Sequence, residues 1–221
     1  MPRESNKARQ QRAVEINKRL QEQYPEASSA LNWRNAFELL VATILSAQST
    51  DEIVNRVIKD LFKKYPTVEA LAAADREELE QDIYSTGFYR RKAKSIQTMA
   101  QKLMDEFDGQ VPQNMEEILA LPGVARKTAN VVLNEAVHSQ TGSYEGIAVD
   151  THVKRVAYRL GLTDRTDPKK VEQDLMELLP RKSWRQVSNG LILLGRQHCT
   201  ARKPNHDDCP LEDLCPKLPV P

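Results

Sequence analysis

The sequence has almost no net charge, no long apolar run and few cysteines, and each shortage excludes a class of protein. Its 221 residues include 32 Lys and Arg against 31 Asp and Glu, so the chain as a whole is not a polycation. No charged-then-apolar leader opens the chain, and no apolar run approaches the length that crosses a bilayer. We therefore expect a soluble, cytoplasmic protein that binds no membrane and has ample length for one large domain or two small ones.

The three cysteines all lie at or after Cys199. This clustering argues against a disulfide-stapled secreted fold and favours a local site in the tail. The tail reads Cys199-x6-His206-x2-Cys209-x5-Cys215.

Apolar spacing and capping residues predict helices along the chain. Asn35 with Glu38 predicts the start of a helix whose run FELLVATILSA is apolar nearly all round and belongs in a core. Ser49 with Glu52 predicts the start of the next helix. Because no run alternates apolar and polar residues between hairpin turns, the predicted fold class is all-α. The other expected features are caps at Thr67 and Asp75 and helices in the segments 1–23, 151–160, 168–179 and 183–197.

The stretch LPGVARKTANVVL, followed by GIAVDTHV, is the most informative part of the chain. Leu121-Pro122-Gly123 predicts a tight turn, because proline presets φ and glycine takes the positive φ that a type II turn requires. Asn114 with Glu117 predicts a helix before this turn, and apolar residues at helical spacing predict a second helix after it.

Lys127 and Asp150 are the candidate catalytic residues of this stretch. Lys127 is expected in the first turn of the second helix, on the polar side that it shares with Asn130 and Asn134. A lysine attacks carbon only as a free amine, and the positive end of a helix disfavours the ammonium. The plain alternatives are an ordinary exposed lysine and, for Asp150, a helix N-cap.

The segment STGFYRRKA, residues 85–93, repeats the spacing of LPGVARKTA. It predicts a second hairpin-like turn in which Arg91 occupies the place of Lys127. Because a guanidinium stays protonated, this copy can hold DNA but cannot react as an amine. The stretches 90–102 and 181–203 contain five and six basic residues and no acidic one. Beside such turns, these runs favour a phosphate backbone as partner over merely solvated helix faces.

These motifs resemble those of the endonuclease III family, the helix-hairpin-helix DNA glycosylases with abasic-site lyase activity. The likeness runs from Asn35 to Cys215 and includes LSAQSTD, STGFYRRKA, the hairpin, AVDTHVKRV and the tail GRQHCTARKP with CPLEDLC. It implies two helical domains flanking a DNA-binding cleft: a six-helix bundle with the hairpin over 31–139, and an iron-sulfur cluster domain from 1–30 and 140–221. It also implies a monomer, associated with the nucleoid, that binds double-stranded DNA containing oxidised pyrimidines or abasic sites.

The resemblance also assigns the chemistry. Lys127 is implied to be the amine that displaces the damaged base at C1′ and forms a Schiff base, after which β-elimination breaks the strand 3′ to the lesion. Asp150 is implied to be the carboxylate that stabilises positive charge on the sugar or assists proton transfer. The alternatives are a monofunctional glycosylase of the adenine-removing type and a non-catalytic DNA-binding hairpin protein. Lys127 argues against the first, and the pair of residues argues against the second.

A glycosylase takes its target nucleotide out of the base stack, so other groups must fill the gap. The resemblance gives this role to Gln48 and to Phe88, where leucine is more usual; a polar helix-end residue and a partly buried aromatic are the plain alternatives. The N–H groups of the hairpin are implied to hold a DNA phosphate. Ala125 stands where LPGVG has a second glycine, and we expect a small effect on affinity. The other expected DNA-contacting residues are Leu121, Gly123, Thr128, His152, Arg202 and Lys203.

In the enzymes that this chain resembles, four cysteines at the spacing of the tail hold a 4Fe-4S cluster. The implied ligands are therefore Cys199, His206, Cys209 and Cys215. A neutral imidazole binds iron or, in a Cys3His site, zinc, so a cluster, a zinc ion and an empty site remain open. His198 matches no expected spacing. With one imidazole in place of a thiolate, we expect a higher reduction potential and greater lability than in a four-cysteine relative.

Overall fold

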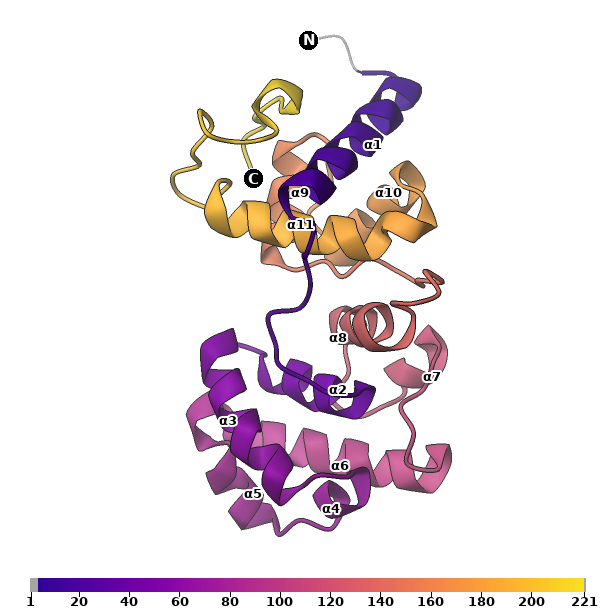
Figure 1. Cartoon of the computed structure of the whole chain (residues 1–221), viewed down its shortest axis with the longest axis vertical. Coiled ribbons are helices and arrows are strands. Elements are labelled where there is room, and N and C mark those ends of the chain that lie inside the picture. Colours follow the sequence, from indigo (N-terminus) through magenta and orange to yellow (C-terminus); the bar gives the residue numbers. More distant parts are fainter. Residues whose placement is uncertain (1–3, 221) are drawn as a thin grey trace. The chain divides into compact units, whose positions relative to one another are not determined.

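Every regular element in residues 4–220, the part of the chain that the computed structural model describes, is a helix (Figure 1). The all-α prediction is confirmed. The chain forms two compact units, Ser29–Val137, and Met1–Ser28 with His138–Pro221. Residues 1–3 and 221, which the expected domains include, lie outside the described residues. Among the helices of residues 4–220, none is both long enough and apolar enough to span a membrane.

The unit Ser29–Val137 is built around a helix that is buried on all sides. α2 (Ala36–Leu45) buries every residue after Ala36, as its apolar run predicts. It packs against α3 (Asp51–Lys64), α6 (Tyr89–Phe107) and α8 (Arg126–Val132). The unit also contains α4 (Val68–Ala72), α5 (Arg76–Asp82), α7 (Met115–Leu119), the 3-10 turn η1 (Tyr84–Thr86) and the π-helical turn η2 (Leu133–Val137).

Side-chain caps start several of these helices where the sequence predicts them. The Asn35 side chain accepts the backbone N–H of Glu38 at 2.9 Å, and the Asn114 side chain accepts that of Glu117 at 2.9 Å. Each cap satisfies one of the donors that a helix start leaves without a partner. The caps of α4 and α5 are also as predicted, at Thr67 and Asp75.

The predicted start at Ser49 is wrong by one residue. Thr50 caps α3, and its hydroxyl oxygen accepts the backbone N–H of Ile53 at 3.3 Å. Gln48, three residues after the end of α2, has a left-handed φ of +54°. Because of this reversal, Ser49 lies in the turn and donates its backbone N–H to the carbonyl oxygen of Ser46.

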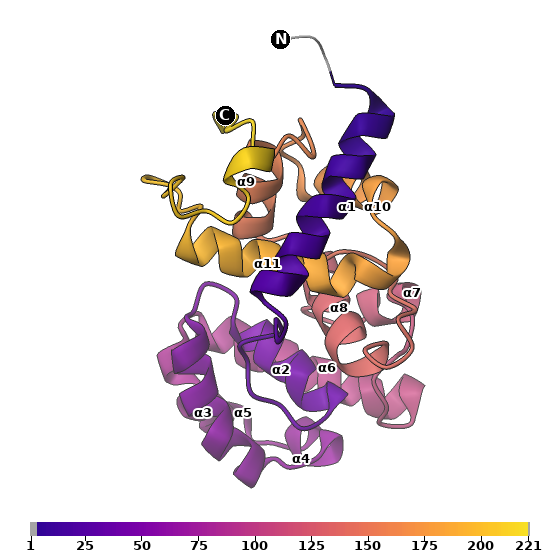
Figure 2. The ribbon, with the colours of Figure 1, turned by 45° about the horizontal axis from the view of Figure 1, so that its top comes forward.

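The other unit joins α1 (Asn6–Gln23) to the helices that follow residue 138. Figures 1 and 2 both show α1 lying across α11 (Trp184–Gln197). The two helices approach closely, because a Cβ atom at Gly190 of α11 would stand 3.0 Å from the Leu20 Cβ. The remaining elements are α9 (Thr151–Arg159), α10 (Pro168–Leu178) and the 3-10 turns η3 (Arg181–Ser183) and η4 (Glu212–Leu214).

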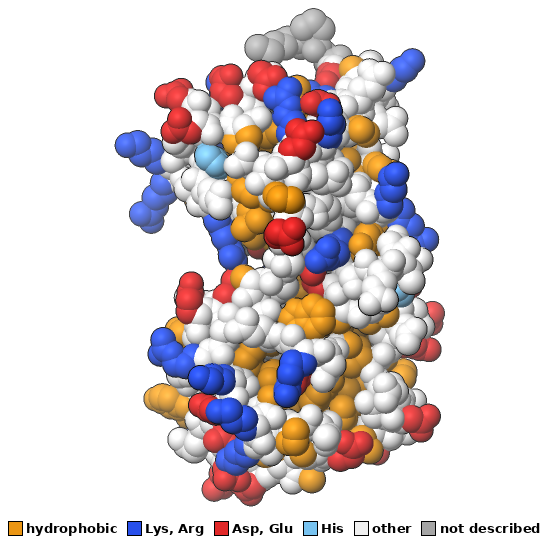
Figure 3. Space-filling model, in the orientation of Figure 1, with side chains coloured by type: hydrophobic (Ala, Val, Ile, Leu, Met, Phe, Trp, Pro, Cys, Tyr) orange, Lys and Arg blue, Asp and Glu red, His pale blue; other side chains and the backbone are white. Residues whose placement is uncertain are grey.

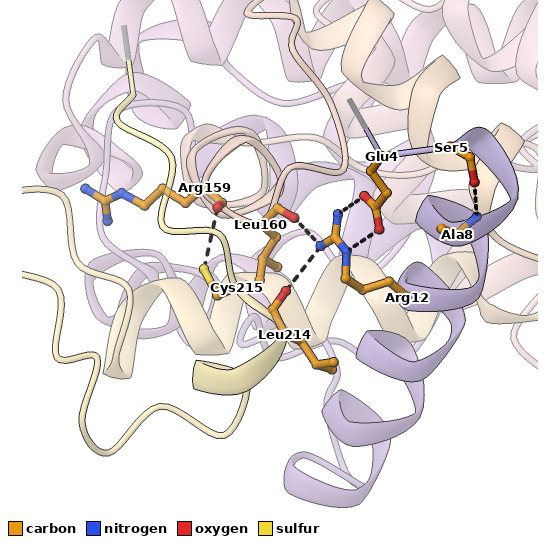
Figure 4. Close-up of polar contacts among 8 residues, drawn as sticks. All are labelled: Glu4, Ser5, Ala8, Arg12, Arg159, Leu160, Leu214 and Cys215. Atoms are coloured by element: carbon orange, nitrogen blue, oxygen red, sulfur yellow. Dashed lines mark hydrogen bonds and ion pairs between the residues drawn. The ribbon is translucent and has the colours of Figure 1, made fainter. Parts of the chain in front are cut away.

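Arg12 fastens α1 to the tail of the chain (Figure 4). Its Nη1 atom donates to the carbonyl oxygens of Leu160 at 2.5 Å and Leu214 at 3.3 Å. The carboxylate of Glu4 pairs with Nη2 at 2.7 Å. The N-terminal helix therefore holds the end of the tail that carries Cys215.

Candidate functional site

The hairpin turn, Leu121 to Val124, has the geometry that its sequence predicts. The backbone N–H of Val124 donates to the carbonyl oxygen of Leu121 at 3.2 Å, and Gly123 has a φ of +80°. A type II turn requires this positive φ at its third residue. Gly123 also lies against α6, where a Cβ atom at position 123 would stand 2.8 Å from the Cβ of Ser95. Position 123 therefore needs glycine for both conformation and space.

The hairpin leads directly into the helix that carries Lys127. Within α8, Arg126–Val132, Lys127 alone is exposed, and it is the second residue of the helix, as predicted. Thr128 is half-buried, and Leu121 is buried beneath the turn. Ala125 occupies the N-cap position and accepts no hydrogen bond through its side chain. The turn thus presents a primary amine to solvent at the start of a helix.

The two asparagines expected on the same side of the helix as Lys127 are buried. Asn130 and Asn134 are only 1% and 2% exposed, so of these three residues only Lys127 reaches solvent. α8 packs against α2 and α7, and its regular geometry gives way to the π-helical turn η2 after Val132. The π-helical turn begins after Asn130, so only the position of Asn134 depends on this wider turn.

Gln48 and Phe88 line one groove of about 370 Å³, called here the Gln48–Phe88 groove. Both residues have a left-handed φ, +54° and +48°, which is unusual for residues other than glycine. Phe88 is 65% exposed, so it is not a partly buried core aromatic. The structure therefore brings these two side chains together with the hairpin glycine. The other lining residues are Ile44, Ala47, Arg91, Lys92, Ser95 and Gly123.

The segment STGFYRRKA forms a turn that differs from the hairpin it resembles in sequence. Gly87 and Phe88 are successive residues with positive φ, +71° and +48°, whereas in the hairpin Gly123 alone has a positive φ. Arg91 is exposed on the first turn of α6. The copy therefore presents a guanidinium, and next to it an exposed aromatic ring.

Asp150 is the N-cap of α9. Its Oδ1 atom accepts the backbone N–H groups of His152 and Val153, each at 2.8 Å, so the N-cap interpretation is confirmed. The side chain remains half-buried, and its second oxygen takes no part in the cap. A carboxylate held by two backbone donors is fixed in direction, which suits a group that must act on a bound reactant.

His152 packs against the end of α11. A Cβ atom at Gly195 would stand 3.0 Å from the His152 Cβ, so glycine allows this approach. The Nη2 atom of Arg155 lies 3.1 Å from His152 Nδ1 and donates to the carbonyl oxygen of Gly195 at 2.9 Å. Nothing in the motif AVDTH singles out Arg155, although its spacing of four from Arg159 places both arginines on one face of α9.

The tail brings its three thiols around a single cavity. Cys199, Cys209 and Cys215 all line it. Burial raises the pKa of the Cys209 thiol, and charge on Cys215 and Cys199 adds to the shift. Burial likewise raises the pKa of Cys215, with a contribution from Cys199. Three sulfurs that interact across one small cavity form a donor set for a soft metal centre.

Hydrogen bonds orient these sulfur atoms. Arg159 Nη1 donates to Cys199 Sγ at 3.3 Å, and the backbone N–H of Lys217 donates to Cys215 Sγ at 3.3 Å. N–H donors of this kind tune the thiolates of iron-sulfur sites. In residues 4–220, no three His, Cys, Asp or Glu side chains are placed to share one metal ion. The common cavity of the three thiols and the N–H donors on two of them fit a sulfur-bound cluster. The zinc alternative has no support.

Both histidines of the tail line the same cavity as the thiols. His206 is half-buried on the loop between Cys199 and Cys209. His198 is the C-cap residue that follows α11, and its Nδ1 atom is buried and meets no hydrogen-bond partner among the residues that the structure describes. Each imidazole is thus positioned near the sulfurs.

The loop after Cys199 carries Arg202 and Lys203 at its exposed side. The Thr200 hydroxyl donates to the carbonyl oxygen of Lys203 at 2.7 Å, and Arg159 donates to that of Ala201 at 2.9 Å. Figure 3 shows basic and acidic side chains close together over the region of this tail. These hydrogen bonds hold parts of the loop, and its surface is not uniformly basic.

The chain matches two protein families. Residues 41–181 match the HhH-GPD superfamily base excision DNA repair proteins. Residues 199–215 match the iron-sulfur binding domain of endonuclease III, and they include the three cysteines. The tail is therefore an iron-sulfur binding domain.

Known proteins resemble the chain over nearly its full length. Endonuclease III of Synechocystis sp. is 54% identical over 209 residues, which are 95% of this chain and 94% of that protein. Endonuclease III of Escherichia coli is 39% identical over 95% of this chain and 96% of its own length. The structure of a trapped endonuclease III–DNA covalent intermediate, 44% identical, matches with a TM-score of 0.86 over 94% of this chain and 96% of that one. A thermostable thymine-DNA glycosylase, 22% identical with a TM-score of 0.83, shares the fold. The chain therefore belongs to the endonuclease III family, within the HhH-GPD superfamily of base excision DNA repair proteins.

Proposed function

We infer that the chain is a bifunctional base excision repair enzyme, a DNA N-glycosylase that is also an abasic-site lyase. The observation that carries this conclusion is the exposed amine of Lys127 at the start of α8, just after the hairpin turn. The chain that presents this amine belongs to the endonuclease III family. One amine accounts for both activities, because it can displace a base and then retain the sugar as an imine.

Lys127 is the proposed nucleophile. Its Nζ atom attacks C1′ of the damaged nucleotide, and the bond from C1′ to the base breaks with its electron pair leaving on the base. Ring opening and loss of a proton from nitrogen give the Schiff base, which makes the C2′ protons acidic. Removal of one C2′ proton then expels the 3′ phosphate and breaks the strand by β-elimination. Water finally hydrolyses the imine and frees the lysine.

Asp150 is the proposed carboxylate that stabilises positive charge on the sugar or assists proton transfer. Its Oδ1 atom is engaged by the N–H groups of His152 and Val153. Those two bonds fix the carboxylate while its other oxygen stays available for the reaction. Fixed charge placed where positive charge develops is among the largest contributions that a site makes to catalysis.

The proposed DNA contacts divide into gap filling and backbone binding. Gln48 and Phe88, on their common groove, take the space that the extruded nucleotide leaves. The backbone N–H groups of the hairpin and the start of α8 bind a phosphate. The other proposed contacts are Leu121, Gly123, Ala125, Thr128, His152, Arg202 and Lys203.

We propose that the cluster of the tail is a 4Fe-4S cluster, held by Cys199, Cys209 and Cys215 with His206 as the fourth ligand. When bound, such a cluster ties the ends of the 199–215 loop together and so orders Arg202 and Lys203 for phosphate contact. Three lines support this set: the common cavity, the N–H bonds to two sulfurs, and the family match of the segment. The corresponding domains are 31–139 for the helical bundle and 1–30 with 140–221 for the cluster domain.

The proposed substrates are oxidised pyrimidines and abasic sites in duplex DNA, bound by a monomer. Borohydride trapping tests the proposal, because borohydride reduces the Schiff base to a stable amine that links protein and DNA. We expect an adduct with thymine-glycol and with abasic duplexes for the wild type and for Lys102→Gln, whose half-buried lysine pairs with Glu106 on α6. No adduct is expected for Lys127→Gln.

Each other result points to a different function. Base release without an adduct would identify a monofunctional glycosylase, and binding without base release or strand cleavage would identify a non-catalytic DNA-binding protein. An adduct that persists in Lys127→Gln would show that another amine is the nucleophile.

A further inference from the structure

A buried lysine joins the two segments that carry Gln48 and Phe88. Lys92, on the first turn of α6, is 5% exposed. Its Nζ atom donates to the carbonyl oxygen of Leu45 at 2.8 Å and to that of Thr86 at 2.7 Å. Leu45 is the last residue of α2 and precedes Gln48 by three positions, and Thr86 precedes Phe88 by two. The Lys92 ammonium therefore links the backbone segment that leads to Gln48 with the one that leads to Phe88.

The two side chains for which the groove is named stand on strained backbone. Gln48 and Phe88 are left-handed at φ of +54° and +48°, a region in which a side chain is disfavoured. Such conformations persist only where the surrounding structure over-determines them, and they gather at functional sites. Lys92, in the lining of the groove, supplies that constraint, because it bonds the last residue of the helical segment before Gln48 and of the one before Phe88.

The chemistry of Lys92 is unusual for a simple core residue. Burial lowers the pKa of its ammonium, which records the cost of removing the charge from water. A side chain needed only to fill space at this position would be apolar, as Ala93 and Ile96 beside it are. The ammonium instead provides hydrogen-bond donors, and two of them donate to backbone carbonyl oxygens at the ends of helical segments.

We propose that Lys92 is a positioning residue for nucleotide extrusion: it holds the Gln48 and Phe88 segments at a fixed separation, so that both side chains enter the duplex together. This inference rests on the proposed role of those two residues in filling the gap. Lys92 lines the groove, but it is only 5% exposed and its Nζ atom donates to two backbone carbonyls. Its loss therefore affects the step that opens the duplex, and the chemistry at Lys127 is unaffected.

Two substrates separate positioning from general structural support. The first is an abasic site within a duplex, which must be extruded. The second is the same abasic site in a single strand, which needs no extrusion. For Lys92→Met we expect the single-turnover rate of adduct formation to fall between about 10-fold and 100-fold on the duplex, as for other misplaced catalytic geometries, and to stay within about 2-fold on the single strand. Lys102→Met, which removes a half-buried ammonium that pairs with Glu106 on the same helix, is expected to change neither rate.

A double-mutant cycle tests whether Lys92 acts through the groove. If it positions Phe88, then Lys92→Met adds little to the loss already caused by Phe88→Ala on the duplex. Fluorescence of 2-aminopurine opposite the lesion gives a second readout, because insertion of the two side chains unstacks that base. We expect the wild-type increase in fluorescence to shrink in Lys92→Met. If Lys92→Met does not fold, Lys92→Gln, which keeps amide donors on a shorter side chain, carries the same comparison.

Equal losses on duplex and single strand in a folded variant would overturn the inference, since loss of active protein lowers both rates alike. Full additivity with Phe88→Ala would overturn it as well. Failure of the wild type to form an adduct with either substrate is a separate result, which rejects the proposed lyase function and the inference with it.

Discussion

Gly123 of the hairpin lies so close to Ser95 of α6 that a Cβ atom at position 123 would stand 2.8 Å from the Ser95 Cβ. Gly123 also holds a φ of +80°. The hairpin is thus fixed to α6 by an approach that only glycine permits, and the position of Lys127, four residues later, depends on that approach.

Gly123→Ala is expected to lower the free energy of unfolding by about 1–3 kcal/mol, because the methyl group meets both a disfavoured φ and the Ser95 side chain. Gly142→Ala is the matched control. Gly142 has a φ of +67° with nothing within 4 Å of an added Cβ, so this variant measures the cost of φ alone. Urea unfolding of both variants, and of Gly123→Ala with and without Ser95→Gly, separates the cost of the positive φ from the cost of the contact with Ser95. Equal losses at the two glycines would show that contact with Ser95 contributes nothing.

Asp150→Asn and Asp150→Ala separate the structural and catalytic parts of Asp150. The asparagine side chain can still accept the N–H groups of His152 and Val153, so we expect Asp150→Asn to stay within about 0.5 kcal/mol of the wild-type stability. Asp150→Ala removes the cap and is expected to cost roughly 0.5–2 kcal/mol. Because both lack the carboxylate, both should lower base release by about 100-fold or more. Thermal unfolding and single-turnover kinetics provide the measurements, and near wild-type base release by Asp150→Asn would exclude a role for the charge.

Phe88→Leu tests whether the aromatic ring sets substrate preference. A phenyl ring stacks on bases more extensively than leucine does, so we expect this variant to change the ranking of lesions and opposite bases in a kinetic panel. Stability should change little, because Phe88 is 65% exposed. Tyr84→Leu, at a neighbouring aromatic that is 61% exposed, is the control that removes a ring outside the lining of the groove. An unchanged ranking in Phe88→Leu would reject the idea.

Local signals in the sequence are sufficient for much of the fold. Asn35 and Asn114 cap helices where the capping boxes place them, and the apolar run of α2 is buried as its composition requires. The same signals fail where the backbone departs from regular geometry. After the left-handed Gln48 the N-cap of α3 is Thr50 and not Ser49, and the π-helical turn η2 accompanies the burial of Asn134.

Long-range contacts could not be predicted, because no local pattern encodes them. The bond from Lys92 to the Leu45 carbonyl spans 47 residues, and the bond from Arg159 to the Cys199 sulfur spans 40. In the sequence both side chains look like ordinary basic residues on helices. Motif spacing locates Lys127, Asp150 and the cysteines, whereas the residues that hold such groups in place become visible only when the fold brings distant segments together.

The identity of the imidazole ligand gives the last prediction, because His198 and His206 both line the cavity of the three thiols. Anaerobically purified protein should absorb broadly near ~400 nm, as iron-sulfur clusters do, and metal analysis should show iron without zinc. We expect His206→Ala to lose this absorption quickly in air and His206→Cys to retain it longer than the wild type. The added thiolate makes the cluster more negative, so His206→Cys should also have a lower reduction potential.

His198→Ala distinguishes the two histidines. If His206 is the ligand, pulsed electron paramagnetic resonance of the paramagnetic cluster should detect a strongly coupled nitrogen in the wild type and in His198→Ala, and none in His206→Cys. His198 nevertheless has a buried Nδ1 atom without a hydrogen-bond partner in the described part of the chain. Loss of the nitrogen coupling in His198→Ala, with its retention in His206→Ala, would therefore transfer the fourth position to His198. Either result depends on which imidazole bonds to iron, and the spacing of the cysteines favours His206.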